Sequence, residues 1–363
     1  MRPTSCDINL DNVAHNVRTL AGHVAPTPLC VVVKANGYGH GAVPVARAAV
    51  DAGALWLGVA LVEEGVELRN AGIDVPILVL SEQHADSVEA LVGNRLVASV
   101  YSSEGIAQLG RAAAQFGAAE VQLVVDSGMR RVGIEVEDLD QCVSQIEASS
   151  NLELTGVWTH CPVADEPGNP FTDAQLARFD SWVGVDGLRF RTHVANSAVA
   201  LTRPSRPALM VRCGISAYGI DPDPALAGIV PLRPALTLRS AVSFVKRVRS
   251  GESVGYGHRW TAPNDTTLAT VPIGYADGVR RDLGLRGGVV LIGGERRRIV
   301  GVITMDQLVV DVGAAHVGVG DDVVLIGSQG DASITAADIA ATLDTIPYEV
   351  VCAIGARVPR RYA

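Results

Sequence analysis

The chain has 363 residues, of which 48% are hydrophobic and only 4% aromatic, so it can bury a large core built mainly from small aliphatic side chains. Its formal net charge is −9 and it has no long Lys/Arg-rich block, which argues against a nucleic-acid or anionic-membrane partner. Residues 1–10 lack the apolar region of a signal peptide, and no uncharged apolar run approaches the roughly 18–20 residues that span a bilayer, so we expect a cytoplasmic protein. The six cysteines are scattered without a Cys-x-x-Cys pair or a His/Cys cluster, which predicts reduced thiols and no metal site.

The first part of the chain alternates short apolar runs with longer amphipathic ones. This alternation, with strands that are apolar throughout, predicts an α/β domain over residues 10–231 in which eight parallel strands close into a (β/α)8 TIM barrel. An open doubly wound sheet is the alternative, but no Gly-x-Gly-x-x-Gly follows the first strand. The expected strands are Leu29–Val33, Trp56–Leu61, Pro76–Leu80, Leu96–Tyr101, Val121–Asp126, Leu154–Thr159, Phe190–Val194 and Leu209–Arg212. The expected helices include Val43–Ala52, Glu63–Asn70, Ser103–Gln115 and Asp173–Val183.

The pattern of apolar residues changes after Pro231, where segments of alternating apolar and polar residues are separated by Gly-rich turns. This pattern predicts a second, mostly antiparallel β domain over residues 232–363, and residues 1–9 are a candidate additional strand for it. The expected strands are Leu236–Val245, Leu268–Pro272, Val289–Ile292, Leu308–Val312 and Val323–Ile326, with one helix at Thr335–Leu343.

Polar residues recur where the predicted barrel strands end, which is where barrel enzymes carry their catalytic groups. They are Lys34, the segment Asp126–Arg131, His160, the segment His193–Ser197 and the segment Arg212–Ser216. Lys34 directly follows a fully apolar strand, and poor solvation there would lower the pKa of its amine and favour attack on an aldehyde. The alternative is a lysine that snorkels to the barrel rim. The glycines at 37, 39 and 41 favour the first interpretation, because a flexible loop lets a bulky ligand approach.

The loops after the last two strands are the usual phosphate site of such barrels. Here they offer the Ser197 hydroxyl and the backbone amides around Gly214 and Ile215. Simple helix capping by Asn196 or Ser197 is the alternative interpretation. A cofactor with one aldehyde and one phosphate would connect Lys34 with this part of the barrel mouth.

Taken together, the motifs resemble those of alanine racemase, a fold-type III pyridoxal-phosphate enzyme. They occur in the family's order over nearly the whole chain, and the full set is highly specific. The matching segments are Val32–Gly41, Asp126–Gly133, Thr159–His160, His193–Ser197, Arg212–Ile215, Ile273–Gly278, Met305–Gln307 and Arg357–Arg360.

The resemblance implies a role for each of these residues. Lys34 is similar to the lysine that binds the pyridoxal 5'-phosphate cofactor and serves as base on one face of the substrate. Tyr275 resembles the base on the opposite face, which in the family's head-to-tail homodimer enters the neighbouring subunit's barrel. The other implied cofactor and substrate contacts are Tyr38, Ser197, Gly214 and Ile215 at the phosphate with Asn196 beside it, Arg212 at the pyridine nitrogen with His193 supporting it, Arg131 at the phenolic oxygen and substrate carboxylate, His160 orienting Tyr275, and Met305 with Asp306 at the substrate.

Two positions depart from the family's pattern. Val124 stands where the family often has a carbamylated lysine that steadies the arginine at position 131, and Ala356 stands where a tyrosine often reaches the phosphate. The four tryptophans show no pattern that predicts stacking.

The resemblance implies a racemase that interconverts L-alanine and D-alanine by a two-base mechanism and supplies D-alanine for cell-wall peptidoglycan. Three alternatives stay open: a racemase of broader scope that also takes substrates such as serine, a non-catalytic pyridoxal-phosphate carrier, and a fold-type III decarboxylase. The carrier is disfavoured because related carriers are single barrels, and the decarboxylase because its glycine-rich phosphate loop and C-terminal signature are not seen.

Overall fold

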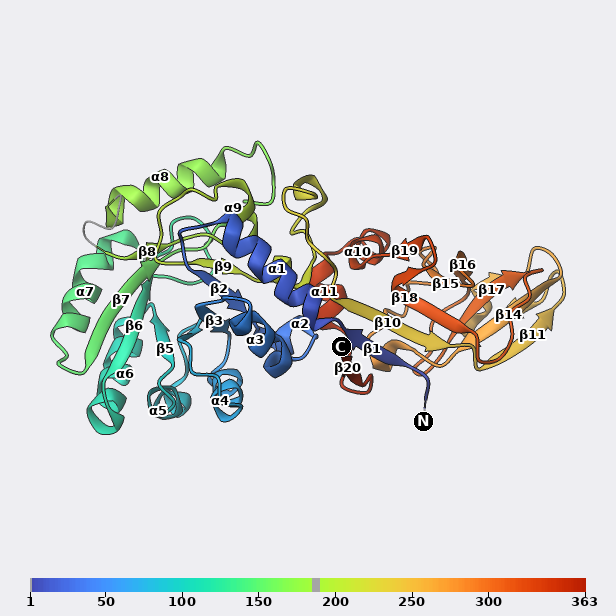
Figure 1. Ribbon diagram of the computed structural model, residues 1–363, viewed down its shortest axis with the longest axis horizontal. Coiled ribbons are helices and arrows are strands. Elements are labelled where there is room, and N and C mark those ends of the chain that lie inside the picture. Colours follow the sequence, from blue (N-terminus) through green and yellow to red (C-terminus); the bar gives the residue numbers. More distant parts are fainter. Residues whose placement is uncertain (1, 185–189) are drawn as a thin grey trace. The chain divides into compact units, whose positions relative to one another are not determined.

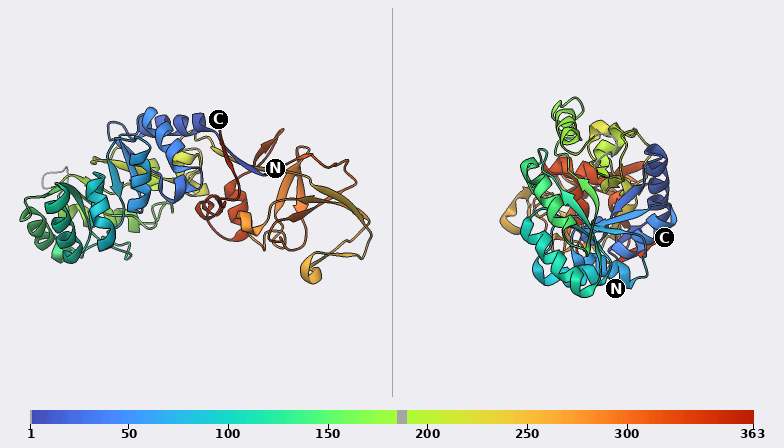
Figure 2. Two further views of the ribbon diagram at one scale, coloured as in Figure 1. Left: turned by 90° about the horizontal axis from the view of Figure 1, so that it is seen from below. Right: turned by 90° about the vertical axis from the view of Figure 1, so that its left-hand side faces the viewer.

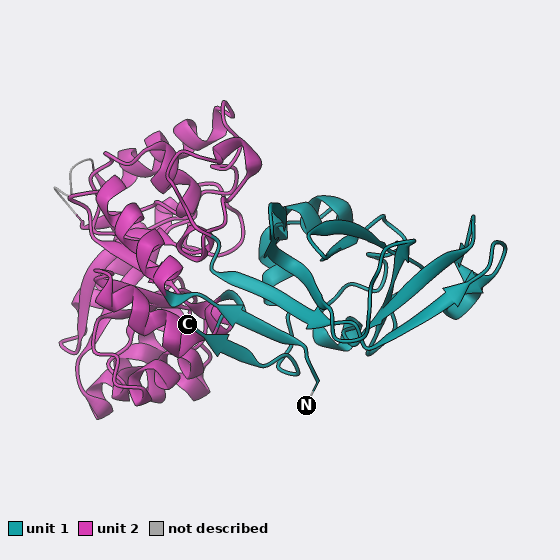
Figure 3. Cartoon of the chain, turned by 45° about the vertical axis from the view of Figure 1, so that its right-hand side comes forward, with its two compact units in different colours: residues 1–10, 38–40, 234–363 teal, residues 11–37, 41–233 magenta. Residues whose placement is uncertain are grey.

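A computed structural model describes residues 2–184 and 190–363 of the chain. The chain forms two compact units, which Figure 3 colours separately. Unit 1 consists of residues 1–10, 38–40 and 234–363, and unit 2 consists of residues 11–37 and 41–233.

Unit 2 is built on an eight-stranded parallel sheet with the order β8-β7-β6-β5-β4-β3-β2-β9. The β8 and β9 segments are joined by two further backbone hydrogen bonds, from Leu209 N–H to Thr192 O (2.6 Å) and from Arg212 N–H to Ala195 O (2.9 Å). The predicted α/β barrel with a β-rich C-terminal domain is confirmed. The strands are β2 (Leu29–Val32), β3 (Trp56–Val59), β4 (Ile77–Val79), β5 (Val97–Val100), β6 (Ala119–Val124), β7 (Leu152–Trp158), β8 (Thr192–His193) and β9 (Val211–Cys213).

Helices surround this sheet, and the right-hand view of Figure 2 shows the blue-to-green helices outside the strands. Side chains cap the N-terminal ends of two of these helices. Ser102 accepts the Gly105 N–H (2.9 Å) at the start of α6, and Asn196 accepts the Val199 N–H (3.0 Å) at the start of α9. Such caps are worth about 1 kcal/mol each. The α-helices are α1 (Leu10–His23), α3 (Ala42–Asp51), α4 (Val62–Asn70), α5 (Ala85–Gly93), α6 (Ser103–Phe116), α7 (Leu139–Glu147), α8 (Phe171–Val183) and α9 (Ser197–Thr202). The short segment labelled α2 (Lys34–Tyr38) has left-handed backbone angles at residues 35–37. The short 3-10 turns are η1 (Val136–Asp138), η3 (Ile215–Tyr218) and η4 (Pro224–Leu226).

Unit 1 contains a ten-stranded sheet with the path β11-β14-β17-β16-β15-β18-β10-β1-β20, in which β19 pairs with β18, and a separate two-stranded sheet of β12 and β13. All of these pairs are antiparallel except β1 with β20. The strands, labelled where space allows in Figure 1, are β1 (Ser5–Ile8), β10 (Leu236–Ala241), β11 (Phe244–Val248), β12 (Ser253–Val254), β13 (Trp260–Thr261), β14 (Thr266–Val271), β15 (Val289–Ile292), β16 (Glu295–Ile299), β17 (Leu308–Gly313), β18 (Asp322–Gln329), β19 (Ala332–Ile334) and β20 (Arg360–Tyr362). The helical segments are η5 (Tyr256–His258), η6 (Tyr275–Asp277), α10 (Ala336–Leu343) and α11 (Pro347–Cys352).

Two features of unit 1 differ from the sequence-based prediction. The expected strand Leu236–Val245 is divided into β10 and β11, because the chain changes partners at Ser243, whose N–H donates to Thr270 O (2.8 Å). Strand β16 was not predicted, because its Glu-Arg-Arg-Arg sequence is mostly exposed and has no apolar alternation, although the strand pairs with β15 and β17 on its two sides. Among the described residues no helix has the length and apolarity needed to cross a membrane, and all six cysteines are free thiols.

Candidate active site

The predicted barrel residues lie at the carboxyl ends of the strands. Lys34 follows β2, Arg131 follows β6, and His160 follows β7. The segment of Asn196 and Ser197 follows β8, and Arg212 is the middle residue of β9. In a parallel barrel these ends form one face, so the strand order itself gathers the polar groups.

Arg212 is the most deeply buried charge of this face, with 3% of its surface exposed. It donates hydrogen bonds through Nη1 to His193 Nδ1 and through Nη2 to Thr159 O (2.9 Å). Because Nδ1 of His193 accepts, its Nε2 carries the proton and donates to Gln122 Oε1 (2.8 Å). Gln122, on β6, therefore fixes the histidine tautomer that accepts from Arg212.

No carboxylate contacts Arg212 within residues 2–184 and 190–363. Burial lowers the pKa of Arg212 to about 10, still well above neutrality, so the side chain is a buried cation held by neutral acceptors. The Trp158 ring lies 4.6 Å from the Arg212 guanidinium carbon and is stacked on His193 with ring centres 5.6 Å apart. The sequence showed no pattern that predicts this stacking, because the partners of Trp158 come from different strands.

His160 is the second histidine near this arginine. Burial, followed by the charges of Arg212, Arg131 and Lys34, lowers the pKa of His160 to about 3. Burial and Arg212 likewise hold the pKa of His193 well below its ordinary value. Both imidazoles are neutral at physiological pH, and His160 Nδ1 accepts from Arg212 Nη2 at 3.5 Å, which leaves its Nε2–H as a donor.

Adjacent arginines on the loop after β6 differ in their contacts. Arg130 donates to both carboxylate oxygens of Glu135 at 2.8 and 3.0 Å. Arg131 is exposed and makes no hydrogen bond or ion pair with any described residue, while Val124, at the position of the family's steadying lysine, is only 2% exposed. Arg131 is thus available to an anionic ligand.

The loop after Lys34 is an ordered left-handed turn, where the sequence predicted a flexible loop. Residues 35–38 have φ between 51° and 61°, and three of these four residues are not glycine. Each left-handed non-glycine residue costs about 1–2 kcal/mol, and such strain is concentrated at functional sites. The Glu64 carboxylate supports the turn by accepting the Ala35 N–H (2.6 Å). Within unit 1, a Cβ on Gly39 would lie 2.4 Å from Val351 O, so this glycine serves close packing.

The predicted phosphate residues are assembled by side-chain contacts in unit 2. Ser197 Oγ accepts the Gly214 N–H (3.0 Å), and Ile215 begins the turn η3, whose first N–H groups have no partner within the turn. Asn196 caps α9 and donates its amide to Cys161 O (3.1 Å), so the capping interpretation holds for Asn196. The Ser216 hydroxyl is buried without a hydrogen-bond partner in the described protein.

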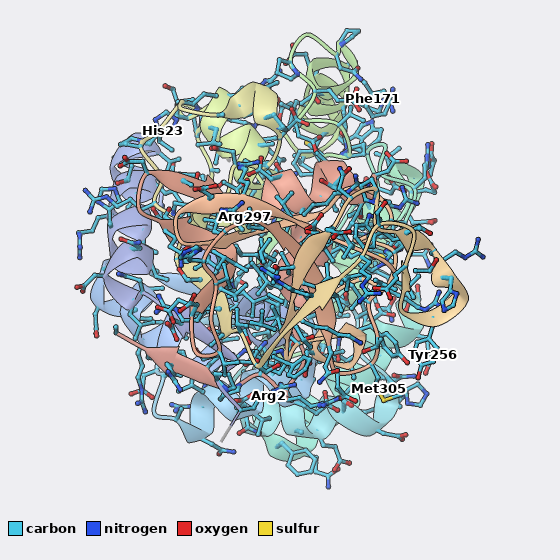
Figure 4. The ribbon with its side chains drawn as sticks, turned by 90° about the vertical axis from the view of Figure 1, so that its right-hand side faces the viewer. Arg2, His23, Phe171, Tyr256, Arg297 and Met305 are labelled. Atoms are coloured by element: carbon cyan, nitrogen blue, oxygen red, sulfur yellow. The ribbon has the colours of Figure 1, made fainter. Side chains whose placement is uncertain are left out.

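Tyr38, Tyr275, Met305 and Asp306 belong to unit 1. Tyr38 is 8% exposed and its ring lies 6.1 Å from that of Tyr348. Tyr275 is 42% exposed and Met305 52% exposed, although both are large side chains. Figure 4 shows Met305 at the outer edge of this unit. The Asp306 carboxylate accepts a hydrogen bond from Arg357 (2.6 Å).

Gln122 and Trp158 are site residues that the sequence did not reveal. Both lie inside predicted strands, where a polar or aromatic residue gives no sign of the barrel-interior partner it contacts. No group of three or more His, Cys, Asp or Glu residues within the described chain could hold a metal ion.

The chain matches two family models in sequence. The model described as alanine racemase, N-terminal domain, covers residues 8–222, and the model for the alanine racemase C-terminal domain covers residues 235–362. A curated alanine racemase of Symbiobacterium thermophilum is 45% identical over 100% of this chain and 97% of its own length. Among solved structures, the alanine racemase of Streptomyces lavendulae superposes with a TM-score of 0.93 at 39% identity, over 100% of this chain and 97% of that one. A histidine racemase of Leuconostoc mesenteroides superposes with a TM-score of 0.90 at 29% identity, over 100% of this chain and 98% of that one.

Proposed function

The chain belongs to the alanine racemase family, and from this premise we propose that it interconverts L-alanine and D-alanine with pyridoxal 5'-phosphate as cofactor. The observation that carries the proposal is the full-length match to both family domains, together with the buried cation Arg212 at the barrel's carboxyl face, which contacts no carboxylate of the described chain. We further propose that residues 10–231 form the cofactor-binding domain and residues 232–363 the β-rich domain that carries Tyr275.

The barrel residues fit this cofactor chemically. Arg212 is a buried cation without a carboxylate partner in the described chain, as suits a residue that faces an electron-rich pyridine nitrogen. Because the pKa of an arginine stays high, it would hydrogen-bond to that nitrogen without giving up its proton. The phosphate would be held by Tyr38, Ser197 and the amides of Gly214 and Ile215, with Asn196 beside it.

When bound, the cofactor withdraws electron density from the amino acid and so acidifies its α-hydrogen. Lys34 would carry the cofactor and move a proton at the substrate's α-carbon on one face. Tyr275 would move a proton on the opposite face, so that one proton leaves as another arrives and the configuration inverts. His160, neutral because its pKa is about 3, would donate through Nε2 to orient Tyr275.

The substrate would be bound by its carboxylate. Arg131 is exposed and makes no ion pair in the described chain, and a charge-assisted hydrogen bond from it would also reach the cofactor's phenolic oxygen. Met305 and Asp306 would complete the substrate site. The family's head-to-tail homodimer would bring these residues and Tyr275 to the partner's barrel, and the exposure of Tyr275 and Met305 in the single chain supports that arrangement.

We propose a cytoplasmic enzyme whose D-alanine is used for cell-wall peptidoglycan. The histidine racemase with the same fold indicates that the architecture by itself does not select the substrate, so a broader amino-acid scope is the second candidate. Enantiomer-resolved product analysis with alanine, serine and histidine separates the two. D-alanine as the main product supports the first, and equal or faster turnover of serine or histidine supports the second.

Covalent labelling tests Lys34 without relying on activity. The chain has only two lysines, Lys34 and Lys246. Borohydride reduction of the cofactor-loaded protein followed by peptide mass spectrometry should place the cofactor on Lys34, in wild type and in the control Lys246→Arg. Labelling that survives in Lys34→Ala would refute the assignment.

Isotope exchange tests the two-base mechanism. In heavy water, Tyr275→Phe should lose inversion by about 100-fold or more, the scale expected when an acid–base group is removed. Lys34 would still exchange the α-hydrogen of one enantiomer with retention of configuration. Normal inversion in Tyr275→Phe would rule out its role, and no exchange in wild type would favour the carrier.

A further inference from the structure

The turn that carries Tyr275 is fixed by its backbone. The N–H of Tyr275 donates to Thr304 O and that of Ala276 to Met305 O, both at 3.0 Å. A Cβ on Gly274 would lie 2.3 Å from Thr304 O, so only glycine allows this approach. The position of the exposed tyrosine therefore depends on the position of η6.

A buried carboxylate anchors the same turn. The Asp277 side chain has 0% exposure, and its Oδ2 accepts the Gly274 N–H at 3.0 Å. Arg2 donates to both carboxylate oxygens at 2.8 Å, in the bidentate geometry that arginine favours. The Nε of Arg357 lies 3.5 Å from Oδ1. Two arginines thus share one carboxylate that caps the turn.

The second arginine, Arg357, extends these contacts to Asp306. Arg357 donates to Asp306 at 2.6 Å, and its own backbone O accepts from Arg2 at 3.2 Å. The Gly355 N–H donates to Asp277 O at 3.0 Å. We call Arg2, Asp277 and Arg357 the Asp277 network. Three segments far apart in the chain meet at it, and Arg2 lies in the lower part of the view in Figure 4.

Resting on the proposed function, we propose that the Asp277 network positions Tyr275 for proton transfer, with Arg2 as a positioning residue supplied by the N-terminal segment. Tyr275 is 42% exposed, so packing within the chain contributes little to its orientation. The backbone of η6 fixes the position of Tyr275 instead. The two hydrogen bonds from Arg2 hold the Asp277 carboxylate that caps η6.

The proposal predicts an asymmetric defect. Arg2→Gln should lower inversion of alanine by about 10- to 100-fold, because a misplacement of about 1 Å can cost about 100-fold. Exchange with retention, which needs only Lys34, should stay within about twofold of the value in Tyr275→Phe. Arg2→Lys keeps the positive charge but cannot donate to both carboxylate oxygens in the bidentate geometry of arginine. It should therefore recover only part of the inversion rate.

Heavy-water exchange, with inversion and retention resolved for each enantiomer, is the measurement. The ratio of inversion to retention is independent of how much protein is folded, so a merely destabilised variant would keep the wild-type ratio. Asp7→Asn is the matched control, because it removes the Asp7–Arg239 ion pair (2.9 Å) of the same N-terminal segment without touching η6. It should keep the wild-type ratio.

The outcomes separate the two proposals. Loss of inversion in Tyr275→Phe together with a wild-type ratio in Arg2→Gln would overturn the positioning role alone. Normal inversion in Tyr275→Phe would overturn the role of Tyr275 and this inference with it. If Arg2→Gln does not fold, Arg357→Gln tests the same carboxylate from its more exposed side, and a wild-type ratio there overturns the inference.

Discussion

The barrel face of unit 2 and the η6 region of unit 1 each contain a buried charge, and the two charges are stabilised by different kinds of partner. In unit 2 the cation Arg212 is held by two carbonyl oxygens, two imidazoles and an aromatic ring, with no carboxylate contacting it in the described chain. In unit 1 the carboxylate Asp277 is saturated by two arginines and a backbone N–H.

This difference distinguishes a charged group that can bind a ligand from a charged group that fixes the backbone. An uncompensated buried cation is costly and keeps its attraction for a ligand, whereas a saturated ion pair has none to offer and fixes the backbone. Under the proposed function, the proton-transferring side chain of unit 1, Tyr275, is exposed on a fixed turn, while the buried cation of unit 2, Arg212, would itself face the ligand.

The largest effect is expected from breaking the fixed turn. Gly274→Ala places a methyl group 2.3 Å from a backbone oxygen, so η6 must move, and inversion should fall by about 100-fold or more. Gly318→Ala is the control, because no atom lies within 4 Å of the position that its new methyl group would take. Similar inversion rates in the two variants would show that η6 tolerates displacement.

The next effect compares neighbouring arginines on the barrel face. Arg131→Gln should raise KM for alanine by about 10- to 100-fold, because a hydrogen bond to a charged group is worth about 1.5–3 kcal/mol. Arg130→Gln removes only the exposed pair with Glu135, which solvent screens, and should leave KM unchanged. Steady-state kinetics with equal KM values in the two variants would contradict the assignment of Arg131.

A smaller effect should follow from placing a carboxylate beside His193, the imidazole that accepts a hydrogen bond from Arg212. Gln122→Glu would stabilise protonated His193, which then faces Arg212 with an N–H and loses the hydrogen bond from it. Inversion should fall about tenfold, at about 1.4 kcal/mol, and kcat should acquire a new titration. The exposed Gln115→Glu adds the same charge elsewhere as a control. If kcat depends on pH in Gln122→Glu as it does in the wild type, the tautomer of His193 does not affect the reaction.

The last prediction concerns acid stability, which changes gradually with pH. The folded-state pKa of His160 is about 3, against 6.5 as its ordinary value, so the unfolded chain binds more protons between these pH values. The free energy of unfolding should therefore fall as the pH falls below 6.5, by at most about 1.4 kcal/mol per pH unit from this group. Urea unfolding at several pH values should show a shallower slope in His160→Asn and an unchanged slope in the exposed control His84→Asn.

Much of the architecture was predictable because it is local. Apolar runs marked the barrel strands, and the polar residue after each run marked its carboxyl end, as Lys34 and His160 show. Strands β11 and β16, which were not predicted as separate strands, depend on neighbours that no local pattern records, and the short strands β12, β13, β19 and β20 were not predicted either.

Partners distant in the chain account for the rest. His193 and Gln122 are 71 positions apart, and Arg2 and Asp277 are 275 positions apart, so neither pair has a sequence signature. Strand periodicity and motif order follow from short-range chemistry, and they suffice to relate the motifs around Lys34 and Tyr275 to a known family. Which acceptor fixes a tautomer and which arginine holds a turn depend on contacts that exist only after the chain has folded.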